Sequence, residues 1–462
     1  MKKSTNIHFE ISERKILLRF LDVSIILLFI YLTSHFVDVS YFKNIFAAPI
    51  SILVLVFYIL FCCTLFEMYN LQVAANQPRI LKEVVVSSIT IVVLYISTPI
   101  ITPVLPNKRI EILLFFSIVF LSLTAWRLFY LKFLTAVRFQ KNVIFVGHSQ
   151  RLLELATELE KADPHYKVKG FLITDNEPIT DASEIQQLNI NEVKNFVNTN
   201  HIVEVVIIDK EKVAIDPIFI TTLLEALESG IVVREFDEVY ETATYRLPIL
   251  DSDQKFFTYF PYGRSNSNRF YLFTVRFFDI LFALIGLVIL LCILPFVMLI
   301  NLFANKGPLF YKQERVGQYG IPFKVFKLRS MVVDAEKNGA QFAQKNDRRI
   351  TPFGRFIRKS RLDEVPQFIN VLKGEMSVIG PRPERLVFVD QISELVPLYK
   401  TRHVIKPGLT GWAQVKFNYG STINDSLIKL QYDLYYIKNR SLALDINIII
   451  KTLNTVLLFK GQ

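Results

Sequence analysis

Long hydrophobic runs alternate with soluble-looking segments along this chain of 462 residues. Four runs fill its first part, at 17–37, 45–66, 84–105 and 112–134. The second and third contain no charged residue, and each is long enough to cross the roughly 30 Å hydrocarbon layer of a membrane as a helix. The pattern therefore predicts a four-helix transmembrane domain over residues 1–138.

Charged residues around these runs predict how the domain lies in the membrane. Basic residues before the first run place the N-terminus in the cytoplasm by the positive-inside rule. They are Lys2, Lys3, Arg14 and Lys15. Four crossings return the chain to the cytoplasm near Lys141, although Lys108 and Arg109 in the third loop weigh against this topology. The first run lacks a small-residue cleavage site, so we expect it to be retained.

The next segment, residues 139–250, has the pattern of a soluble α/β domain. The runs NVIFVG, VEVVIID and GIVVREF predict strands, and SQRLLELATELEK predicts an amphipathic helix. This alternation favours a Rossmann-like parallel sheet. The turn GHSQRL after the first strand has one glycine and lacks the glycine-rich pattern that holds a pyrophosphate. Nucleotide binding and a scaffolding or regulatory role both stay open for this domain.

A polar linker, residues 251–275, precedes a fifth hydrophobic run at 280–304. Pro295 interrupts this run, and proline bends a helix because it lacks a backbone N–H. Basic residues flank the run on both sides, which predicts that both of its ends lie on the cytoplasmic face. We therefore expect residues 276–304 to form a re-entrant membrane helix. The alternative is an ordinary fifth span, which would export the rest of the chain.

The remaining residues, 305–462, are predicted to form a mainly helical cytoplasmic domain at the membrane surface. The segment TPFGRFIRKS has hydrophobic residues on one helical face and cations on the other, as in a helix lying on an anionic bilayer. An ordinary solvated helix is the alternative. The last hydrophobic stretch is broken by Asp445 and Lys451, which favours a docked amphipathic helix over another span.

The composition agrees with a membrane protein, since 52% of the residues are hydrophobic and 40 are Phe. The net charge of +11 suits anionic lipids or phosphorylated substrates. Nucleic acid is the weakest candidate partner, because the hydrophobic runs already assign the chain to a membrane. Cys62, Cys63 and Cys292 lie in hydrophobic segments and have neither disulfide nor zinc spacing.

The most informative polar stretch is KSRLDEVPQ, in which Asp363 and Glu364 follow a run of cations. The hydrophobic residues after this pair have helical spacing, so the pair lies near a helix N-terminus. One interpretation is purely structural: Asp363 caps the helix, and the helix dipole favours Glu364.

Five basic residues in nearby segments favour a phosphate-binding site. They are Arg315 in QERVG, Lys327 and Arg329 in FKVFKLRSM, Arg358 in RKS and Arg382 in GPRP. Guanidinium groups match phosphate oxygens, and a diphosphate also binds Mg²⁺ that one or two carboxylates hold. No histidine occurs between His201 and His403, which favours a carboxylate nucleophile over a histidine base.

Five blocks of sequence resemble the signature motifs of the bacterial sugar transferases. These are the polyprenyl-phosphate hexose-1-phosphate transferases of exopolysaccharide, capsule and O-antigen assembly. The blocks are QERVGQYG, FKVFKLRSM, RKSRLDEVPQFINVLKGEMSVIGPRPE, KPGLTGWAQV and YDLYYIKNRSLALD. The resemblance covers residues 270–462, and its departures, RLDEVPQ for SLDELPQ and GEMS for GDMS, are small and put no motif residue in doubt. The order of spans, α/β domain, re-entrant helix and catalytic domain also resembles the large members of this family.

The resemblance implies an enzyme that transfers hexose-1-phosphate from a UDP-sugar to undecaprenyl phosphate, releasing UMP. Asp363 would be the nucleophile, Glu364 the ligand of a Mg²⁺ cofactor, and Lys327, Arg358 and Arg382 the phosphate-handling residues. The enzyme would be a multi-pass protein of the bacterial inner membrane, with its catalytic domain on the cytoplasmic side. Glucose and galactose are the expected sugars, N-acetylated hexoses less so, and a homodimer through the hydrophobic four-span domain stays open.

Two other functions compete with this one. A membrane-bound nucleotide-sugar dehydratase or epimerase would need a glycine-rich turn and a Tyr-x-x-x-Lys pair, and none of the 19 tyrosines has Lys four residues later. A non-catalytic scaffold for polysaccharide assembly would also use the spans and the α/β domain. An assay of UMP release separates a scaffold from a transferase.

Overall fold

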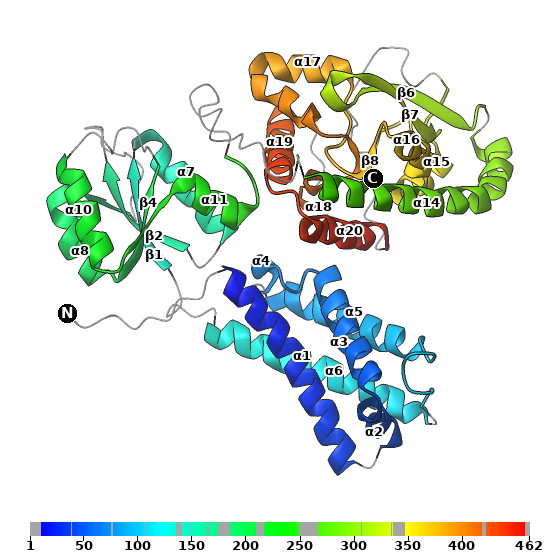
Figure 1. Cartoon of the computed structure of the whole chain (residues 1–462), viewed down its shortest axis with the longest axis horizontal. Helices are drawn as coiled ribbons and strands as arrows, with labels where there is room; N and C mark the ends of the chain where they lie inside the picture. Colours follow the sequence, from blue (N-terminus) through cyan, green and yellow to red (C-terminus); the bar gives the residue numbers. More distant parts are fainter. Residues whose placement is uncertain are drawn as a thin grey trace. The chain divides into compact units, whose positions relative to one another are not determined.

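In the computed structural model the chain forms two compact units, Met1–Thr244 and Tyr245–Gln462 (Figure 1). The structure describes residues 11–37, 39–74, 77–106, 108–134, 141–147, 149–163, 166–173, 185–208, 217–248, 266, 268–305, 307–333, 335, 347–417 and 422–457. Most of the predicted linker 251–275, and His148 in the turn after the first strand, lie outside these residues.

The helical part of the first unit contains hydrophobic helices of unequal length. They are α1 (Ile11–Phe36), α2 (Ser40–Ala47), α3 (Pro49–Leu65), α4 (Leu71–Ala74), α5 (Gln77–Ile96), α6 (Arg109–Phe129) and the π-helical turn η1 (Tyr130–Leu134). The run at 84–105 is helical only as far as Ile96, because Pro99 and Pro103 follow and proline does not continue a helix. The prediction of one helix over that whole run is therefore wrong.

Three helices of the described chain are long and hydrophobic enough to cross a membrane. They are Glu13–Phe36, Arg109–Phe133 and Arg269–Ala304. The consecutive helices α2 and α3, bent by 99° relative to each other, add a fourth if they form one span. These helices indicate a membrane protein.

A buried ion pair joins the first and last helices of this part. Arg127 of α6 donates a hydrogen bond of 2.5 Å to Asp22 of α1, and both side chains are fully buried. A charge in a hydrophobic bundle is costly unless it is paired. Asp22 of the first run and Arg127 of the fourth therefore hold α1 against α6.

The α/β part of the first unit contains a five-stranded sheet. Its elements are β1 (Lys141–Gly147), α7 (Ser149–Ala162), β2 (Tyr166–Ile173), β3 (Gln186–Leu188), η3 (Ile190–Glu192), α8 (Val193–Thr199), β4 (Ile202–Ile207), α10 (Pro217–Glu228), β5 (Val232–Glu235) and α11 (Phe236–Thr244). The strand order is β3-β2-β1-β4-β5, and each neighbouring pair is parallel. The prediction of a parallel sheet is confirmed, although β2 and β3 were not among the predicted strands.

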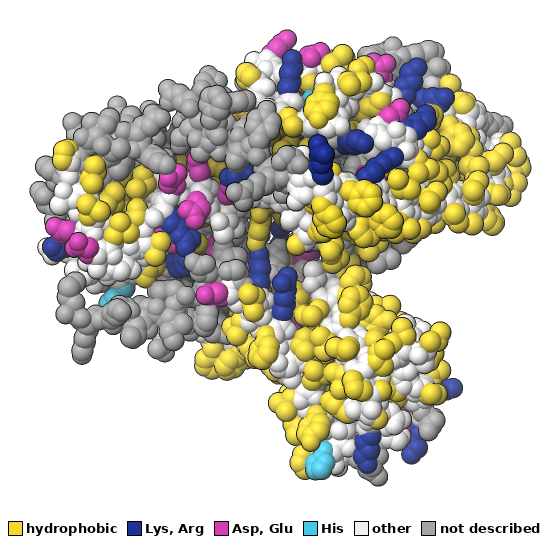
Figure 2. Space-filling model, in the orientation of Figure 1, with side chains coloured by type: hydrophobic (Ala, Val, Ile, Leu, Met, Phe, Trp, Pro, Cys, Tyr) yellow, Lys and Arg dark blue, Asp and Glu magenta, His cyan; other side chains and the backbone are white. Residues whose placement is uncertain are grey.

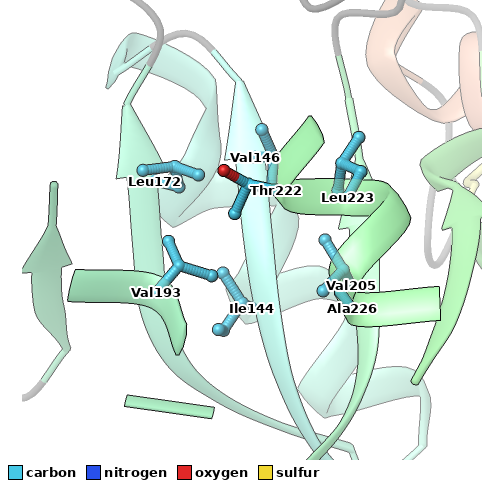
Figure 3. A pocket seen from close by; sticks show the side chains of 8 residues that line it. All are labelled: Ile144, Val146, Leu172, Val193, Val205, Thr222, Leu223 and Ala226. Atoms are coloured by element: carbon cyan, nitrogen blue, oxygen red, sulfur yellow. The ribbon is translucent and has the colours of Figure 1, made fainter. Parts of the chain in front are cut away.

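One face of this sheet encloses a small cavity, in which hydrophobic side chains of the strands face those of α8 and α10 (Figure 3). Its walls are Ile144, Val146, Leu172, Val193, Val205, Thr222, Leu223 and Ala226. A nucleotide site needs several polar groups to fix the ligand, and these walls supply one hydroxyl. The cavity is therefore a gap in the packing of the domain core.

The second unit combines one long helix with a mainly helical domain. Its elements are α14 (Arg269–Ala304), β6 (Phe310–Val316), η4 (Gln318–Gly320), β7 (Pro322–Leu328), α15 (Pro352–Lys359), η5 (Leu362–Gln367), α16 (Phe368–Lys373), β8 (Ser377–Ile379), α17 (Leu386–Leu395), η6 (Pro397–Val404), β9 (Gly408–Thr410), α18 (Trp412–Lys416), α19 (Ile423–Lys438) and α20 (Leu442–Leu457). Strands β6 and β7 form an antiparallel hairpin, and β8 pairs with β9 in parallel.

The N-terminal half of α14 is bound to the domain by polar contacts. Arg276 donates to the carbonyl oxygens of Val371 and Leu372 at 2.7 and 2.8 Å, and these carbonyls end α16. Asp279 accepts from the hydroxyl of Ser377 at 2.9 Å and the backbone N–H of Val378 at 2.7 Å. The helix is therefore tied to the two segments that follow the acidic pair in the sequence.

Close packing adds to these contacts. A Cβ atom on Gly286 would lie 2.1 Å from the ring of Phe368, so only glycine lets α14 approach α16 this closely. The helix continues through Pro295, and hydrophobic side chains gather on its surface (Figure 2). A surface of this kind suits contact with lipid.

The last helix, α20, is docked on the domain. Asp445 accepts hydrogen bonds from Tyr271 at 2.7 Å and Tyr436 at 2.8 Å, and Ile448 is fully buried in the core. In α15, Ile357 is buried whereas Phe356 is exposed. The predicted hydrophobic face of α15 is thus divided between the core and the surface.

We predict that a fragment covering residues 245–462 is more stable than one that begins at residue 265. Leu247 is buried, its N–H donates to Gln431, and the indole of Trp412 donates to the carbonyl of Tyr245, both at 3.1 Å. Loss of the buried Leu side chain alone should lower the free energy of unfolding by about 2 kcal/mol. Denaturant unfolding of both fragments in detergent, followed by Trp412 fluorescence, measures the difference. Equal midpoints would contradict the assignment of Tyr245 and Leu247 to this unit.

Candidate active site

The site is built around a buried 3₁₀ turn that carries the acidic pair. Arg361 precedes the turn with a left-handed φ of 59°, which redirects the chain after α15. Asp363 and Glu364 lie inside η5, with relative exposures of 7% and 8%. Asp363 is therefore not the N-cap of a helix, and the capping interpretation does not account for its burial.

Three cations neutralise Glu364. Arg382 donates to Oε1 at 2.6 Å, Arg361 donates to Oε2 at 3.2 Å, and the Lys327 ammonium lies 3.8 Å from Oε1. Burial alone would raise the pKa of Glu364, but the charges of Arg382, Lys327 and Arg361 hold it well below its usual range. Glu364 is thus ionised at neutral pH, and both of its oxygens have cationic partners.

Asp363 is in a different state although it is adjacent in sequence. Its Oδ1 atom is buried and has no hydrogen-bond partner among the described residues. Burial and the negative charge of Glu364 raise the pKa of Asp363 to about 6, while Lys327, Arg358 and Arg382 oppose this rise. Asp363 therefore holds its proton more tightly than an exposed aspartate does, and its Oδ1 meets no hydrogen-bond donor among the described residues.

The β6–β7 hairpin supplies Lys327. This residue lies near the end of β7, opposite Tyr311 of β6. Burial lowers the pKa of Lys327 to about 8, with Arg382 and Arg315 adding to this effect and Glu364 opposing it. Lys327 therefore remains a cation at neutral pH, where it lies close to the acidic pair.

Arg382 lies in a tightly packed backbone segment. A Cβ atom on Gly380 would lie 2.4 Å from the carbonyl oxygen of Lys406, and one on Gly408 would lie 2.1 Å from the amide nitrogen of Gly380. The two chain segments, GPRP and KPGLTG, can approach this closely only because both positions are glycine. The main chain of Arg382 is fixed as a result.

A buried ion pair supports the same segment. Arg402 donates to the carbonyl oxygen of Arg382 at 3.1 Å and to Asp433 at 2.7 Å, and it also donates to the hydroxyl of Tyr399. Arg402 and Asp433 have side-chain exposures of only 4% and 2%. Sequence reasoning gave neither residue a role, because they lie 31 positions apart and only the fold brings them together.

The other predicted phosphate ligands differ in their surroundings. Arg358 donates to the hydroxyl of Ser330 at 3.0 Å, and its charge acts on Asp363. Arg315 lies 3.5 Å from Glu384 and donates to the carbonyl of Pro383, so it contacts the two residues that follow Arg382 in the chain.

Arg329 is not brought into the cluster. Its guanidinium donates to the carbonyl oxygens of Pro308 and Met331 and to both the side chain and the backbone of Asn305. These contacts fasten the chain that follows α14 to the end of β7. Arg361, by contrast, contacts Glu364 directly, although nothing in the sequence distinguishes it from its cationic neighbours Arg358 and Lys359.

The described residues do not form a ready-made metal site. No group of three or more His, Cys, Asp or Glu side chains in the described part of the chain is arranged to hold an ion. Both oxygens of Glu364 have cationic partners, so a Mg²⁺ ion can bind Glu364 only if one of them leaves. In this arrangement, the residues do not fit a resident Mg²⁺ ion on Glu364.

The arrangement is suited to chemistry on a phosphate ester. Lys327, Arg358 and Arg382 provide positive charge that stabilises phosphate oxygens. Asp363 provides a carboxylate that can attack an electrophile, because its Oδ1 atom accepts no hydrogen bond from the described residues.

Residues 270–459 match the family model described as bacterial sugar transferase. The chain is 46% identical over 187 residues to the UDP-N-acetylgalactosamine-undecaprenyl-phosphate N-acetylgalactosaminephosphotransferase of Aeromonas hydrophila, covering 40% of this chain and 44% of the relative. It is 52% identical over 132 residues to the putative undecaprenyl-phosphate N-acetylgalactosaminyl 1-phosphate transferase of Bacillus subtilis (strain 168). This match covers 29% of this chain and 74% of the relative. A third relative, the UDP-glucose:undecaprenyl-phosphate glucose-1-phosphate transferase of Xanthomonas campestris pv. campestris, is 48% identical over 157 residues. This match covers 33% of this chain and 32% of the relative. The chain thus spans less than half the length of the first and third relatives.

We predict that Arg402→Met destabilises the second unit, because it leaves the Asp433 carboxylate buried without its partner. The free energy of unfolding should fall by about 3–5 kcal/mol. The double variant Arg402→Met/Asp433→Leu should recover most of this loss, since two hydrophobic side chains replace a buried pair at little cost. Unfolding is followed by Trp412 fluorescence in a Trp126→Phe background. A single variant as stable as the parent would show that the pair does not support the Arg382 segment.

Proposed function

Because the chain belongs to the bacterial sugar transferase family, we propose that it transfers hexose-1-phosphate from a UDP-sugar to undecaprenyl phosphate, releasing UMP. This would be the priming step of exopolysaccharide, capsule or O-antigen synthesis. The observation that carries the proposal is the asymmetry of the acidic pair: Glu364 is bound by cations, whereas Oδ1 of Asp363 has no partner among the described residues.

The names of the relatives support the substrate classes. Each of the three names undecaprenyl phosphate as the acceptor, and two name a UDP-sugar as the donor. Two carry N-acetylgalactosamine and one carries glucose, so the expected preference for unacetylated hexoses gains no support from them. We propose a UDP-hexose or UDP-N-acetylhexosamine as the donor.

The proposed reaction has two displacements at one phosphorus. A carboxylate oxygen of Asp363 attacks the phosphorus that bears the sugar, and the bond from this phosphorus to the oxygen of UMP breaks. A phosphate oxygen of undecaprenyl phosphate then attacks the same phosphorus, which releases Asp363 as a carboxylate and forms undecaprenyl-diphosphate-sugar. Lys327, Arg358 and Arg382 hold the phosphate oxygens and offset their charge, so that an anion can approach them.

We propose Mg²⁺ as the cofactor, entering together with the diphosphate of the donor. Mg²⁺ sites commonly combine one or two carboxylates with substrate phosphates and water. A bound ion would add positive charge to the diphosphate. Glu364 remains the proposed protein ligand, once a cation has left it.

We also propose the topology that places this site at the cytoplasmic face of the bacterial inner membrane. In this topology all four hydrophobic runs would cross the membrane before the α/β domain, of which α1, α6 and the α2–α3 pair are candidate spans by length and composition. Helix α14 would enter and leave the membrane on the same side. The basic flanks of the 280–304 run and the attachment of the first half of α14 to the segments that follow the acidic pair support this arrangement.

The function is tested by UMP release from purified protein supplied with undecaprenyl phosphate, Mg²⁺ and a panel of UDP-sugars. Asp363→Asn should lower the rate at least about a thousandfold while nucleotide-sugar binding survives, because the nucleophile alone is removed. Asp390→Asn, at an exposed position of α17, is the matched control and should keep the parental rate. Undiminished UMP release by Asp363→Asn would refute the proposed nucleophile, and no release with any donor would favour a scaffold.

The topology is tested by thiol labelling in a Cys292→Ala background, since Cys62 and Cys63 are buried whereas Cys292 is exposed. Arg269→Cys, before the hydrophobic part of α14, and Glu314→Cys, on β6 beyond it, are both at exposed positions. Neither should react with a membrane-impermeant reagent applied from outside the cytoplasmic membrane, and both should react in inverted vesicles. Labelling of Glu314→Cys alone from outside would show that α14 is a true span.

A further inference from the structure

Two cations meet in front of Gly374, the residue that ends α16 with a left-handed φ of 82°. A Cβ atom on Gly374 would lie 3.5 Å from Nζ of Lys406. It would also lie 3.7 Å from Nη2 and 3.9 Å from Cζ of Arg276, and these are the nearest atoms outside the adjoining chain. The ammonium group and the guanidinium group therefore border the same small space.

Acidic side chains of the described residues do not pair with these two cations. Arg276 donates to two backbone carbonyl oxygens, and within the part of the chain that the structure describes neither Arg276 nor Lys406 has a carboxylate at ion-pair distance. Burial lowers the pKa of Lys406, with the charge of Arg276 adding to this effect and that of Asp279 opposing it. Asp279 is itself occupied, because its Oδ1 atom accepts two hydrogen bonds. Two neighbouring cations with one distant carboxylate favour the binding of an anion.

Exposed hydrophobic side chains of α14 lie beside Arg276. Phe273, Phe277 and Ile280 have relative exposures of 70%, 56% and 38%. They are three or four residues apart and therefore form one stripe along the helix. Arg276 is three residues after Phe273 and four before Ile280, so it borders this stripe. An anion bound by Arg276 would thus have a hydrophobic surface next to it.

The phosphate group of a membrane lipid combines the two properties that this surface requires. Its oxygens accept hydrogen bonds from guanidinium and ammonium groups. A guanidinium has five N–H donors, and the two carbonyl oxygens take two of those of Arg276. A lipid also covers the hydrophobic stripe, which a soluble anion would leave exposed to water. An anionic phospholipid is favoured over a zwitterionic one, because its headgroup carries no ammonium group that would repel the two cations.

We propose that Arg276 and Lys406 bind the phosphate of an anionic glycerophospholipid whose acyl chains lie along the stripe of α14. The residues of this phospholipid site are distinct from those that contact the acidic pair, and the lipid is not a reactant. It links α14 to the KPGLTG segment, in which the carbonyl oxygen of Lys406 lies 2.4 Å from the position of a Cβ atom on Gly380. A bound lipid therefore fastens the membrane helix to a segment that packs against the backbone before Arg382.

The phospholipid site is tested by photo-crosslinking of the full-length protein in phosphatidylcholine nanodiscs. The probe is a trace of phosphatidylglycerol with a diazirine in one acyl chain, and peptide mass spectrometry locates the label. Labelling of residues 273–280 should be saturable and should fall when unlabelled phosphatidylglycerol is added. Absence of label there, or label that unlabelled phosphatidylglycerol does not displace, would overturn the proposal, because general contact with lipid is not saturable.

Variants of Lys406 separate the site from packing and from general charge. In Lys406→Gln, the concentration of phosphatidylglycerol that halves the labelling should rise about tenfold, because one charged donor to the phosphate is lost. Lys406→Arg keeps the charge and should match the parent. Lys373→Gln is the matched control, since Lys373 ends the same helix but its Nζ atom lies 4.9 Å from the centre of the Phe326 ring. An equal loss in Lys373→Gln, or a loss in Lys406→Arg, would overturn the proposal.

Two competitors separate a phospholipid from other carriers of phosphate. Glycerol 1-phosphate, which has no acyl chain, should not displace the probe, and displacement would show a site for soluble phosphates instead. Undecaprenyl phosphate should displace the probe no better than phosphatidylglycerol does. Stronger displacement would assign the two cations to that lipid and overturn the proposal. These measurements do not involve UMP release, so their outcome is independent of the proposed function.

Discussion

The neutralisation of Glu364 by three cations is the interaction on which the site depends. Two adjacent carboxylates in a buried turn repel each other, and burial disfavours the ionised form of both. Arg382, Lys327 and Arg361 contact Glu364 directly and hold it ionised, whereas Lys327 and Arg382 act on Asp363 only through their charge. The pair is thereby divided into a carboxylate bound by cations and a carboxylate with an unpartnered oxygen. In the proposed reaction, this division would leave Asp363 available as the nucleophile while Glu364 stays bound to the cations.

The fold maintains this division by fixing the backbone on every side of the pair. A hairpin places Lys327, a left-handed residue begins the turn, and glycine contacts lock the segment of Arg382. The long helix α14 is bound to the segments that follow the pair through Arg276 and Asp279. The hydrophobic helix α14 and the cluster of acidic and basic side chains are thus joined by direct contacts. Such an arrangement suits an enzyme whose acceptor is a lipid and whose donor is soluble.

The parallel sheet and the membrane character could be predicted from the sequence because both depend on local hydrophobic patterns. The strand β2 was missed, since YKVKGFLI mixes charged and hydrophobic residues, and the run at 84–105 was overextended because its prolines were given too little weight. At the site, Lys327 and Arg329 looked equivalent in FKLRS, yet one lies beside Glu364 and the other binds backbone carbonyls near Asn305. Sequence shows which cations are present, whereas only the fold decides which carboxylate or carbonyl each one meets. The Arg402–Asp433 pair was missed for the same reason.

The central claim, that Asp363 is a nucleophile, is tested most directly by looking for its covalent product. Purified protein is given a UDP-sugar labelled in the phosphate that bears the sugar, without undecaprenyl phosphate, and is quenched within the first turnover. The account predicts a peptide carrying label on Asp363, a matching burst of UMP, and loss of the label when undecaprenyl phosphate is added. Absence of label and of the burst, together with sequential kinetics, would show that the sugar phosphate passes directly to the lipid.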